Sequence, residues 1–190
     1  MATSINEYEK IILGIDPGTN IMGYGVLGCT KNKYELISLG IINLKKMDNH
    51  AKKLKHIFER CTAVIDQYKP DEVSIEAPFY GKNPQSMLKL GRAQGVAMAA
   101  ALNRGLPIFE YAPKKIKQSI TGNGNSSKEQ VAAMLQSLLK FSDMPTHLDA
   151  TDALAIALCH YFQGTSKIEV TGAKYNSWKS FIANNPDKLK

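Results

Sequence analysis

Four carboxylates stand at the ends of apolar segments, where an acidic side chain needs a reason. Asp16 follows the run KIILGI and Glu76 closes the run EVSI, while Asp149 and Asp152 lead into ALAIAL. A buried carboxylate is strongly destabilising unless a cation or hydrogen-bond donors compensate its charge. Because residues three apart on a helix share a face, Asp149 and Asp152 are neighbours, and strand ends of one sheet can converge on them. These positions predict one shared acidic site.

A cluster of carboxylate oxygens, with no matching set of histidines and cysteines, is typical of Mg²⁺ or Mn²⁺ and not of zinc. Two such ions about 3.5 to 4 Å apart activate a water on one side of a phosphodiester and stabilise the departing oxygen on the other. The acids therefore indicate metal-dependent hydrolysis of a phosphodiester.

Simpler explanations of single residues remain open. Asp16 fits a turn residue in DPGT, and Asp149 fits a helix cap at the positive end of the helix dipole. His147, two residues before Asp149, is either an additional ligand or proton carrier, or a surface histidine. Four separate coincidences are nevertheless a weaker explanation than one site.

Hydrophobic periodicity predicts the elements that must position these acids. Strands are expected at residues 10–16, 21–28, 34–43, 72–76 and 106–111. Helices are expected at residues 51–68, 84–103, 127–140 and about 148–161, with a short helical stretch at 114–118. Ser127 and Gln130 have the spacing of a capping box. The first three strands suit an antiparallel meander, and the whole order predicts an α/β fold with a mixed five-stranded sheet flanked by helices, compatible with a ribonuclease H-like fold.

Length and composition predict a single domain and a polyanionic partner. The 190 residues suit one compact domain, expected at 1–163, followed by a weakly attached polar tail at 164–190. The net charge is +7, and residues 81–128 hold eight basic side chains and one acidic side chain. Gathered on one side, this segment would suit nucleic acid, although a solvated charged face is the alternative.

The chain is expected in the cytoplasm. Its three cysteines, Cys29, Cys61 and Cys159, are far apart and odd in number, which favours reduced thiols. No apolar run approaches the roughly 18 residues of a membrane helix, and the polar start does not suit a signal peptide.

Four stretches resemble, in the same order, the RuvC-type Holliday junction resolvases, a family of homodimeric bacterial endonucleases with the ribonuclease H-like fold. They span about residues 11–160 and are ILGIDPGTNIMGYGV, SIEAPFYGKNPQSMLKLGRAQGVA, PIFEYAPKKIKQSITGNGNSSKEQV and DATDALAIALCH. The resemblance implies metal-dependent hydrolysis in which each subunit of a dimer nicks one of two opposed strands of a four-way junction. It also implies a role in DNA recombination and repair.

The same resemblance implies roles for individual residues. The four acids Asp16, Glu76, Asp149 and Asp152 would be the catalytic residues that bind Mg²⁺, two ions per active site, with Mn²⁺ as a substitute. Lys117 and Lys128 would contact DNA near the cut, and Lys128 would also stabilise developing negative charge. Phe79 would press against bases at the junction centre. Ala77 and Pro78 depart from the family's usual residues, which leaves the pose of the Phe79 loop open.

Partners are implied in the same way. A homodimer is expected, with residues 84–103 as part of its interface because this helix has a small-residue surface, although core packing explains the alanines equally well. The small residues are Gly91, Gly95, Ala97, Ala99, Ala100 and Ala101. A branch-migration motor complex of the RuvA and RuvB type is the expected protein partner.

Two other functions stay open. One is a junction-binding scaffold that has lost cleavage, against which the intact acids argue. The other is an actin-like nucleotide-binding phosphotransferase fragment, because IDPGTN also resembles the phosphate loop of those proteins. They close two such domains around the nucleotide, and 190 residues are too few for both.

Overall fold

The computed structural model describes residues 8–31, 33–78 and 83–165, and its centre is a five-stranded sheet. The strands are β1 Lys10–Asp16, β2 Ile21–Cys29, β3 Tyr34–Asn43, β4 Glu72–Glu76 and β5 Ile108–Tyr111. Their order across the sheet is β3-β2-β1-β4-β5. The first three strands pair antiparallel, whereas β4 pairs parallel to β1 and β5 parallel to β4. The predicted mixed sheet and its antiparallel meander are confirmed.

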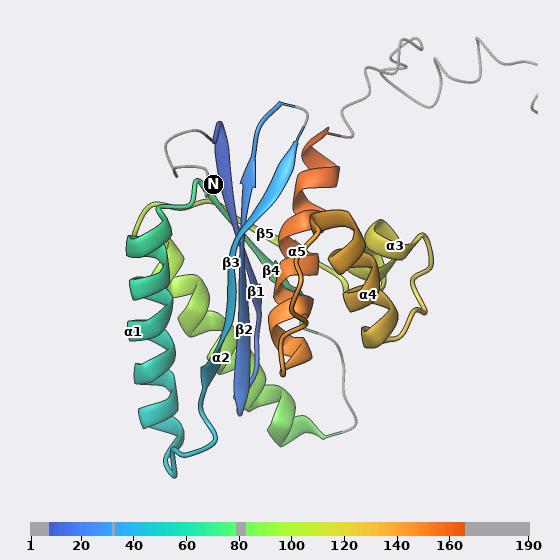
Figure 1. The fold of residues 1–190 in the computed structure, drawn as a ribbon. Coiled ribbons are helices and arrows are strands. Elements are labelled where there is room, and N and C mark those ends of the chain that lie inside the picture. The colour runs from blue at the N-terminus through green and yellow to red at the C-terminus, as the bar shows by residue number, and fades with distance from the viewer. Residues whose placement is uncertain (1–7, 32, 79–82, 166–190) are drawn as a thin grey trace, which may run out of the picture.

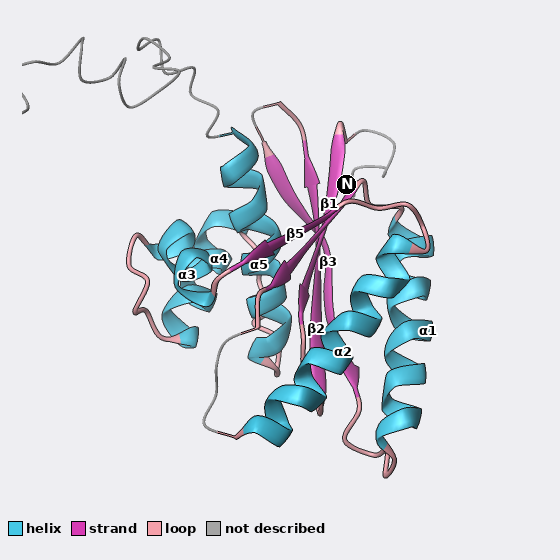
Figure 2. Ribbon diagram, turned by 180° about the vertical axis from the view of Figure 1, so that it is seen from behind, coloured by secondary structure: helices cyan, strands magenta, loops and turns pink. Residues whose placement is uncertain are grey.

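Five helices cover the two faces of this sheet (Figure 1). They are α1 His50–Tyr68, α2 Pro84–Leu102, α3 Pro113–Thr121, α4 Lys128–Leu139 and α5 Leu148–Thr165. Figure 2 shows α1 and α2 lying together on one face, while α3, α4 and α5 lie on the other. Each face has its own apolar core, so the central strands are buried from both sides.

Local signals set most of the element ends. Ser127 and Gln130 form the predicted capping box at the start of α4, since each side chain bonds the other residue's backbone N–H. The fifth strand is shorter than expected and begins at Ile108, after Pro107, which has no backbone N–H to donate. The last helix runs beyond the expected residue 161 to Thr165.

The cysteines are structural. Cys29, Cys61 and Cys159 are free and buried, and burial raises the pKa of Cys29 and of Cys61 to about 12. Thiols with such values are rarely ionised near neutral pH and make poor nucleophiles. Within the described ranges, no helix has the length and apolar character that crossing a bilayer requires.

Helix α5 lies unusually close to the sheet because glycines face it. A Cβ built on Gly14 of β1 would lie 2.1 Å from the carbonyl oxygen of Ala153, and one on Gly23 of β2 would lie 1.9 Å from the carbonyl oxygen of Asp149. At the far end of the helix, His160 Nε2 lies 2.7 Å from Glu72 Oε2, and His160 Nδ1 lies 2.6 Å from the Tyr111 hydroxyl. Close backbone contact at one end and polar contacts at the other therefore fix α5 on the sheet.

Replacing Gly14 by alanine should lower the free energy of unfolding by about 1 to 3 kcal/mol, because the added methyl group meets the α5 backbone. Urea unfolding followed by circular dichroism measures this. Gly164→Ala is the control: a Cβ there meets nothing within 4 Å, and alanine in the last turn of a helix should leave stability unchanged or slightly higher. Equal stability of the Gly14 variant and wild type would contradict the close packing.

Candidate active site

Strand alternation directs two of the predicted acids to the same face of the sheet. In β1, Leu13 and Ile15 pack in the core beneath α1 and α2, whereas Ile12 packs in the core beneath α5. Asp16 shares the parity of Ile12, because successive strand residues point to opposite faces. In β4, Ile75 likewise belongs to the α1 and α2 side, which leaves Glu76 on the α5 side. Both carboxylates therefore stand at strand ends and face α5.

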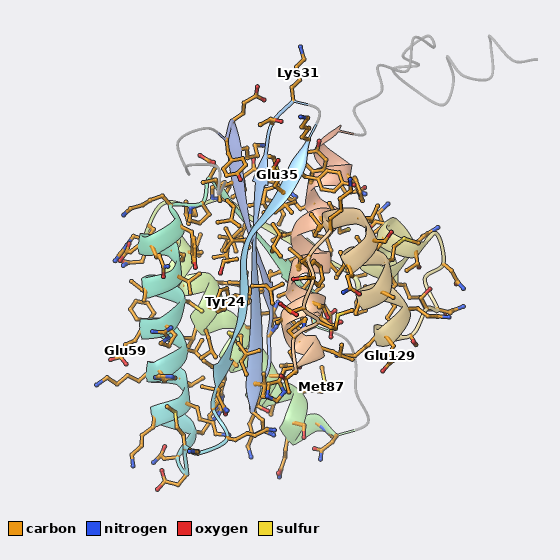
Figure 3. All side chains as sticks on the ribbon, viewed as in Figure 1. Tyr24, Lys31, Glu35, Glu59, Met87 and Glu129 are labelled. Atoms are coloured by element: carbon orange, nitrogen blue, oxygen red, sulfur yellow. The ribbon has the colours of Figure 1, made fainter. Side chains whose placement is uncertain are left out.

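The first turns of α5 bring the other two acids to the same place. Asp149 and Asp152 lie three residues apart at the start of the helix, and the Asp149 carbonyl rests on Gly23, the pairing partner of Asp16. Figure 3 labels Met87 of α2 and Glu129 of α4 toward this end of the molecule and Lys31 at the opposite end. Three segments far apart in sequence thus carry four acids to one end of the sheet.

The carboxylates destabilise one another as anions. Burial, followed by the charges of Glu76 and Asp152, raises the pKa of Asp16 from 3.8 to about 8. Burial and then the charge of Asp152 raise the pKa of Glu76. Burial also raises the pKa of Asp152, against the lowering effect of Lys128. Without a bound cation, the site tends to keep protons that ordinary carboxylates would lose.

Two lysines accompany the acids. The Lys128 ammonium donates to Asp152 Oδ2 in an ion pair, which raises the pKa of Lys128 although burial alone would lower it. Lys117 Nζ instead donates to the Ser126 carbonyl oxygen at 2.7 Å. Its charge still acts on the carboxylates of Glu76 and Asp152. Both lysines predicted from the sequence therefore lie beside the acidic cluster.

A hydrogen-bonded loop that sequence reasoning missed holds Lys117. Thr121 Oγ1 lies 2.8 Å from Ser126 Oγ, and both hydroxyls also contact the Asn123 carbonyl oxygen. Ser126 is buried and its carbonyl receives Lys117. The polar composition of TGNGNSS indicates a loop, but it does not reveal which of its residues form hydrogen bonds with one another or with Lys117.

Gln94 is a second residue that the sequence did not single out. It is 4% exposed on α2, and its Nε2 donates to the Glu76 carbonyl oxygen at 3.3 Å and to Glu110 Oε2 at 3.1 Å. This contact fixes the backbone of Glu76 at the end of β4, and with it the position from which the Glu76 side chain extends. A buried glutamine within an alanine-rich helix was the available signal.

Other predicted residues fall elsewhere. Phe79 and Lys82 lie outside the described residues. Arg104, part of the basic segment, pairs with Asp66 at 2.8 Å near the end of α2, so its charge is neutralised locally. His147 precedes α5, and its carbonyl oxygen accepts from the Ala150 N–H. The structure gives its side chain no hydrogen bond within the described part of the chain.

The donor set suits a hard divalent cation, although the side chains do not yet enclose one. In the described ranges, no three histidine, cysteine or acidic side chains are grouped so as to hold one ion. The Asp16, Glu76 and Asp149 carboxylates make no hydrogen bond or ion pair with any described residue, which leaves their oxygens available. Unneutralised carboxylates repel one another, and among the residues that the structure describes Lys128 is the cation that pairs with Asp152. The oxygen chemistry fits Mg²⁺ or Mn²⁺.

A mixed sheet with helices on both faces and acids at its strand ends defines the class as ribonuclease H-like nucleases. The family model for crossover junction endodeoxyribonuclease RuvC matches residues 12–160. A RuvC of Bacteroides fragilis is 61% identical over 184 residues, which cover 96% of this chain and 97% of the relative. That of Cytophaga hutchinsonii is 59% identical over 96% of this chain and 89% of the relative.

A solved structure, described as T. thermophilus RuvC in complex with Holliday junction substrate, superposes with a TM-score of 0.77 at 30% identity. The match covers 83% of this chain and 96% of that chain. The chain belongs to the crossover junction endodeoxyribonuclease RuvC family. Its activity is divalent-metal-dependent cleavage that resolves Holliday junctions in DNA recombination and repair, as the resemblance implied.

The raised pKa of Asp16 makes stability depend on pH. Its folded pKa of about 8 lies above the ordinary 3.8, so the stability that the protonated form contributes is present at low pH and is lost as pH rises through about 8. Asp16→Asn should therefore raise the free energy of unfolding of the metal-free protein at pH 9, by on the order of 2 to 5 kcal/mol, and by less at pH 5.

Urea unfolding in EDTA at the two pH values measures the effect. Asp66→Asn is the control, because it removes an exposed carboxylate that is paired with Arg104 and should give no gain at pH 9. Equal gains for Asp16→Asn at both pH values would show that Asp16 is not held as described.

Proposed function

We propose that Asp16, Glu76, Asp149 and Asp152 are the catalytic, metal-binding carboxylates of this endonuclease. The observation that carries the proposal is their convergence from two strand ends and one helix, with three pKa values raised by burial and by mutual repulsion. A bound cation would relieve that repulsion, which gives these residues a common purpose. Neither a turn role for Asp16 nor a capping role for Asp149 accounts for it.

We propose Mg²⁺ as the metal, two ions per active site, with Mn²⁺ as a substitute. Carboxylates are the ligands that both ions prefer, and acids from three segments supply enough oxygens for two. When bound, such ions activate a water and stabilise the leaving oxygen of the cut strand. The protein's own part is to hold the four carboxylates at one end of the sheet and to place Lys117 and Lys128 beside them.

Asp16→Asn and Asp152→Asn should each slow cleavage of a synthetic four-way junction at least about a hundredfold, because each removes a charged ligand. Junction binding should persist or tighten, since a negative charge next to DNA is lost. Denaturing gels with Mg²⁺ or EDTA measure cutting, and gel shifts in Ca²⁺ measure binding.

Asp66→Asn, the same chemical change away from the site, is the matched control and should cut normally. Cleavage by the Asp16 variant at the normal rate would remove it from the site. A wild-type protein that binds the junction but never cuts it with any divalent metal would favour the scaffold alternative.

DNA contacts are proposed for Lys117, Lys128 and Phe79. Lys117 and Lys128 border the acidic end, where a strand must lie to be cut, and each is a suitable partner for a phosphate. Phe79 precedes α2 in sequence and lies outside the described residues. Its proposed role is to stack on bases at the junction centre, where one stacked base contributes about 1 to 3 kcal/mol.

Lys117→Ala and Phe79→Ala should weaken junction binding in distinguishable ways. Loss of a phosphate contact should reduce the slope of log binding constant against log salt by about 1. Loss of a stacked ring should lower affinity at every salt concentration and leave the slope unchanged. Fluorescence anisotropy over a salt series in Ca²⁺ tests both, and an unchanged slope for the lysine variant would place Lys117 away from the phosphates.

A homodimer is proposed, with an uncharged stripe of α2 at its interface. The stripe consists of Leu88, Gly91, Gly95, Ala99 and Leu102, which recur every three or four residues and are exposed. Leu88 and Leu102 are 64% and 62% exposed, and a Cβ on either glycine would meet nothing within 4 Å. The alanines at 93, 97, 100 and 101 pack inside instead. A dimer would let two sites nick opposed strands symmetrically.

Leu88→Glu should convert the dimer to a monomer, because a buried unpaired carboxylate opposes association. Light scattering after size-exclusion chromatography measures the mass. Phe58→Glu, on the partly exposed α1 surface, is the control and should remain dimeric. A Leu88 variant that stays dimeric would place the interface elsewhere.

Three broader assignments complete the proposal. A branch-migration motor complex of the RuvA and RuvB type is the proposed partner, and its addition should stimulate cleavage of a mobile junction. A cytoplasmic location is proposed from the buried free thiols and a DNA substrate. The nuclease domain is proposed to occupy 1–163 and the polar tail 164–190, so limited proteolysis should remove the tail first.

A further inference from the structure

The Lys128 ammonium occupies the acidic cluster in a way that a DNA-contacting lysine would not need. It is ion-paired with Asp152, and its charge also acts on the carboxylates of Asp16 and Asp149. The Asp152 side chain is only 17% exposed, whereas that of Lys128 is 54% exposed. Lys128 therefore reaches into the cluster from solvent and presents the acids with a positive charge.

The start of α4 fixes the backbone of Lys128, whereas a single ion pair with Asp152 holds its side chain. Lys128 is the first residue of α4 and lies within the capping box formed by Ser127 and Gln130. Within the described part of the chain, its ammonium has one hydrogen-bond acceptor, Asp152 Oδ2. A four-carbon side chain from a fixed helix end can exchange one anionic partner for another without moving the fold.

Lys117 offers the contrast. It carries the same charge and acts electrostatically on Glu76 and Asp152, yet its ammonium is held by the Ser126 carbonyl oxygen at 2.7 Å. That carbonyl belongs to a buried residue whose hydroxyl is itself bonded to the loop. Lys117 is therefore held by a carbonyl oxygen and not by a carboxylate, and among the described residues only Lys128 pairs with one of the four acids.

We propose that Lys128 is an exchangeable cation: it neutralises Asp152 while the site lacks metal, and a divalent ion that binds Asp152 displaces it toward the phosphate of the bound strand. The exchange rests on the proposed metal-binding role of the acids, and it adds that metal binding precedes the contact of Lys128 with the DNA. The displaced ammonium becomes available to the DNA only after the metal has bound. Between metal-binding events, the same ammonium limits the repulsion among the carboxylates.

The proposal predicts opposite effects on metal affinity and on cleavage rate. Lys128→Met removes the competitor, so the full-length variant without DNA should bind Mn²⁺ about three- to tenfold more tightly, as expected for loss of a partly exposed ion pair. Its cleavage rate at saturating Mn²⁺ should nevertheless fall about a hundredfold, because the phosphate loses a cation. Electron paramagnetic resonance of free Mn²⁺ gives the affinity, and single-turnover gels give the rate.

Lys117→Met is the matched control, because it removes an equal charge that does not pair with a carboxylate. Its Mn²⁺ affinity should change by about twofold or less. Equal tightening in the two lysine variants would show that only long-range charge matters and would overturn the exchange. Unchanged or weaker Mn²⁺ binding by Lys128→Met would also overturn it.

A third variant separates this inference from the proposed function. Asp16→Asn should lose Mn²⁺ binding. If wild type binds Mn²⁺, Asp16→Asn does not, and Lys128→Met matches wild type, the metal site stands and the exchange fails. If Asp16→Asn binds Mn²⁺ like wild type, the proposed metal site itself fails. Thermal unfolding checks the fold, since Lys128→Met should be less stable than wild type in EDTA, and saturating Mn²⁺ should reduce the difference.

Discussion

Like-charged carboxylates held together away from water repel one another, and the functional end of this molecule is organised around that repulsion. The pKa of Asp16, at about 8, shows how strongly burial and its neighbours oppose the charged form. In solution such a cluster would separate. Here it persists because the sheet and α5 hold the chain on both sides of it, so packing elsewhere supports an unfavourable arrangement that the proposed metal ions would stabilise.

The scaffold meets this constraint by dividing tasks between the two faces of one sheet. The α1 and α2 face is closed by apolar side chains from alternate strand positions. The other face carries the acids at its end, while α3, α4 and α5 supply a second apolar core behind them. The alternation of side chains between the two faces of a strand therefore places the apolar residues in the cores and the acids at the strand ends, so the charged site does not interrupt either core.

Much of this could be predicted from the sequence because the relevant signals are local. The bounds of β1, β3 and β4 agree with the expected ones, since each run of apolar residues ends at a turn or a charged residue. Helix α5 was expected because a stretch such as ALAIAL must be buried. The convergence of the acids follows from strand parity and helix spacing, which are also local patterns.

Local patterns cannot predict which residues from distant segments form hydrogen bonds or ion pairs with one another. Gln94 bonds the end of β4, and Ser126 receives Lys117, but neither residue type identifies its partner in advance. The pairing of Lys128 with Asp152 joins segments 24 positions apart and depends on how α4 lies against α5. Phosphate and carboxylate are equally good acceptors for a lysine, so composition cannot decide between them.

The contact between Gly23 and the Asp149 carbonyl has a consequence for judging relatives from genome sequences. An alanine at position 23 would force the start of α5 away from β2, and with it two of the four acids, without altering any acidic residue. A survey that scores only the carboxylates would count such a chain as an intact enzyme. A glycine at position 23 is thus as informative about the proposed site as the four acids themselves.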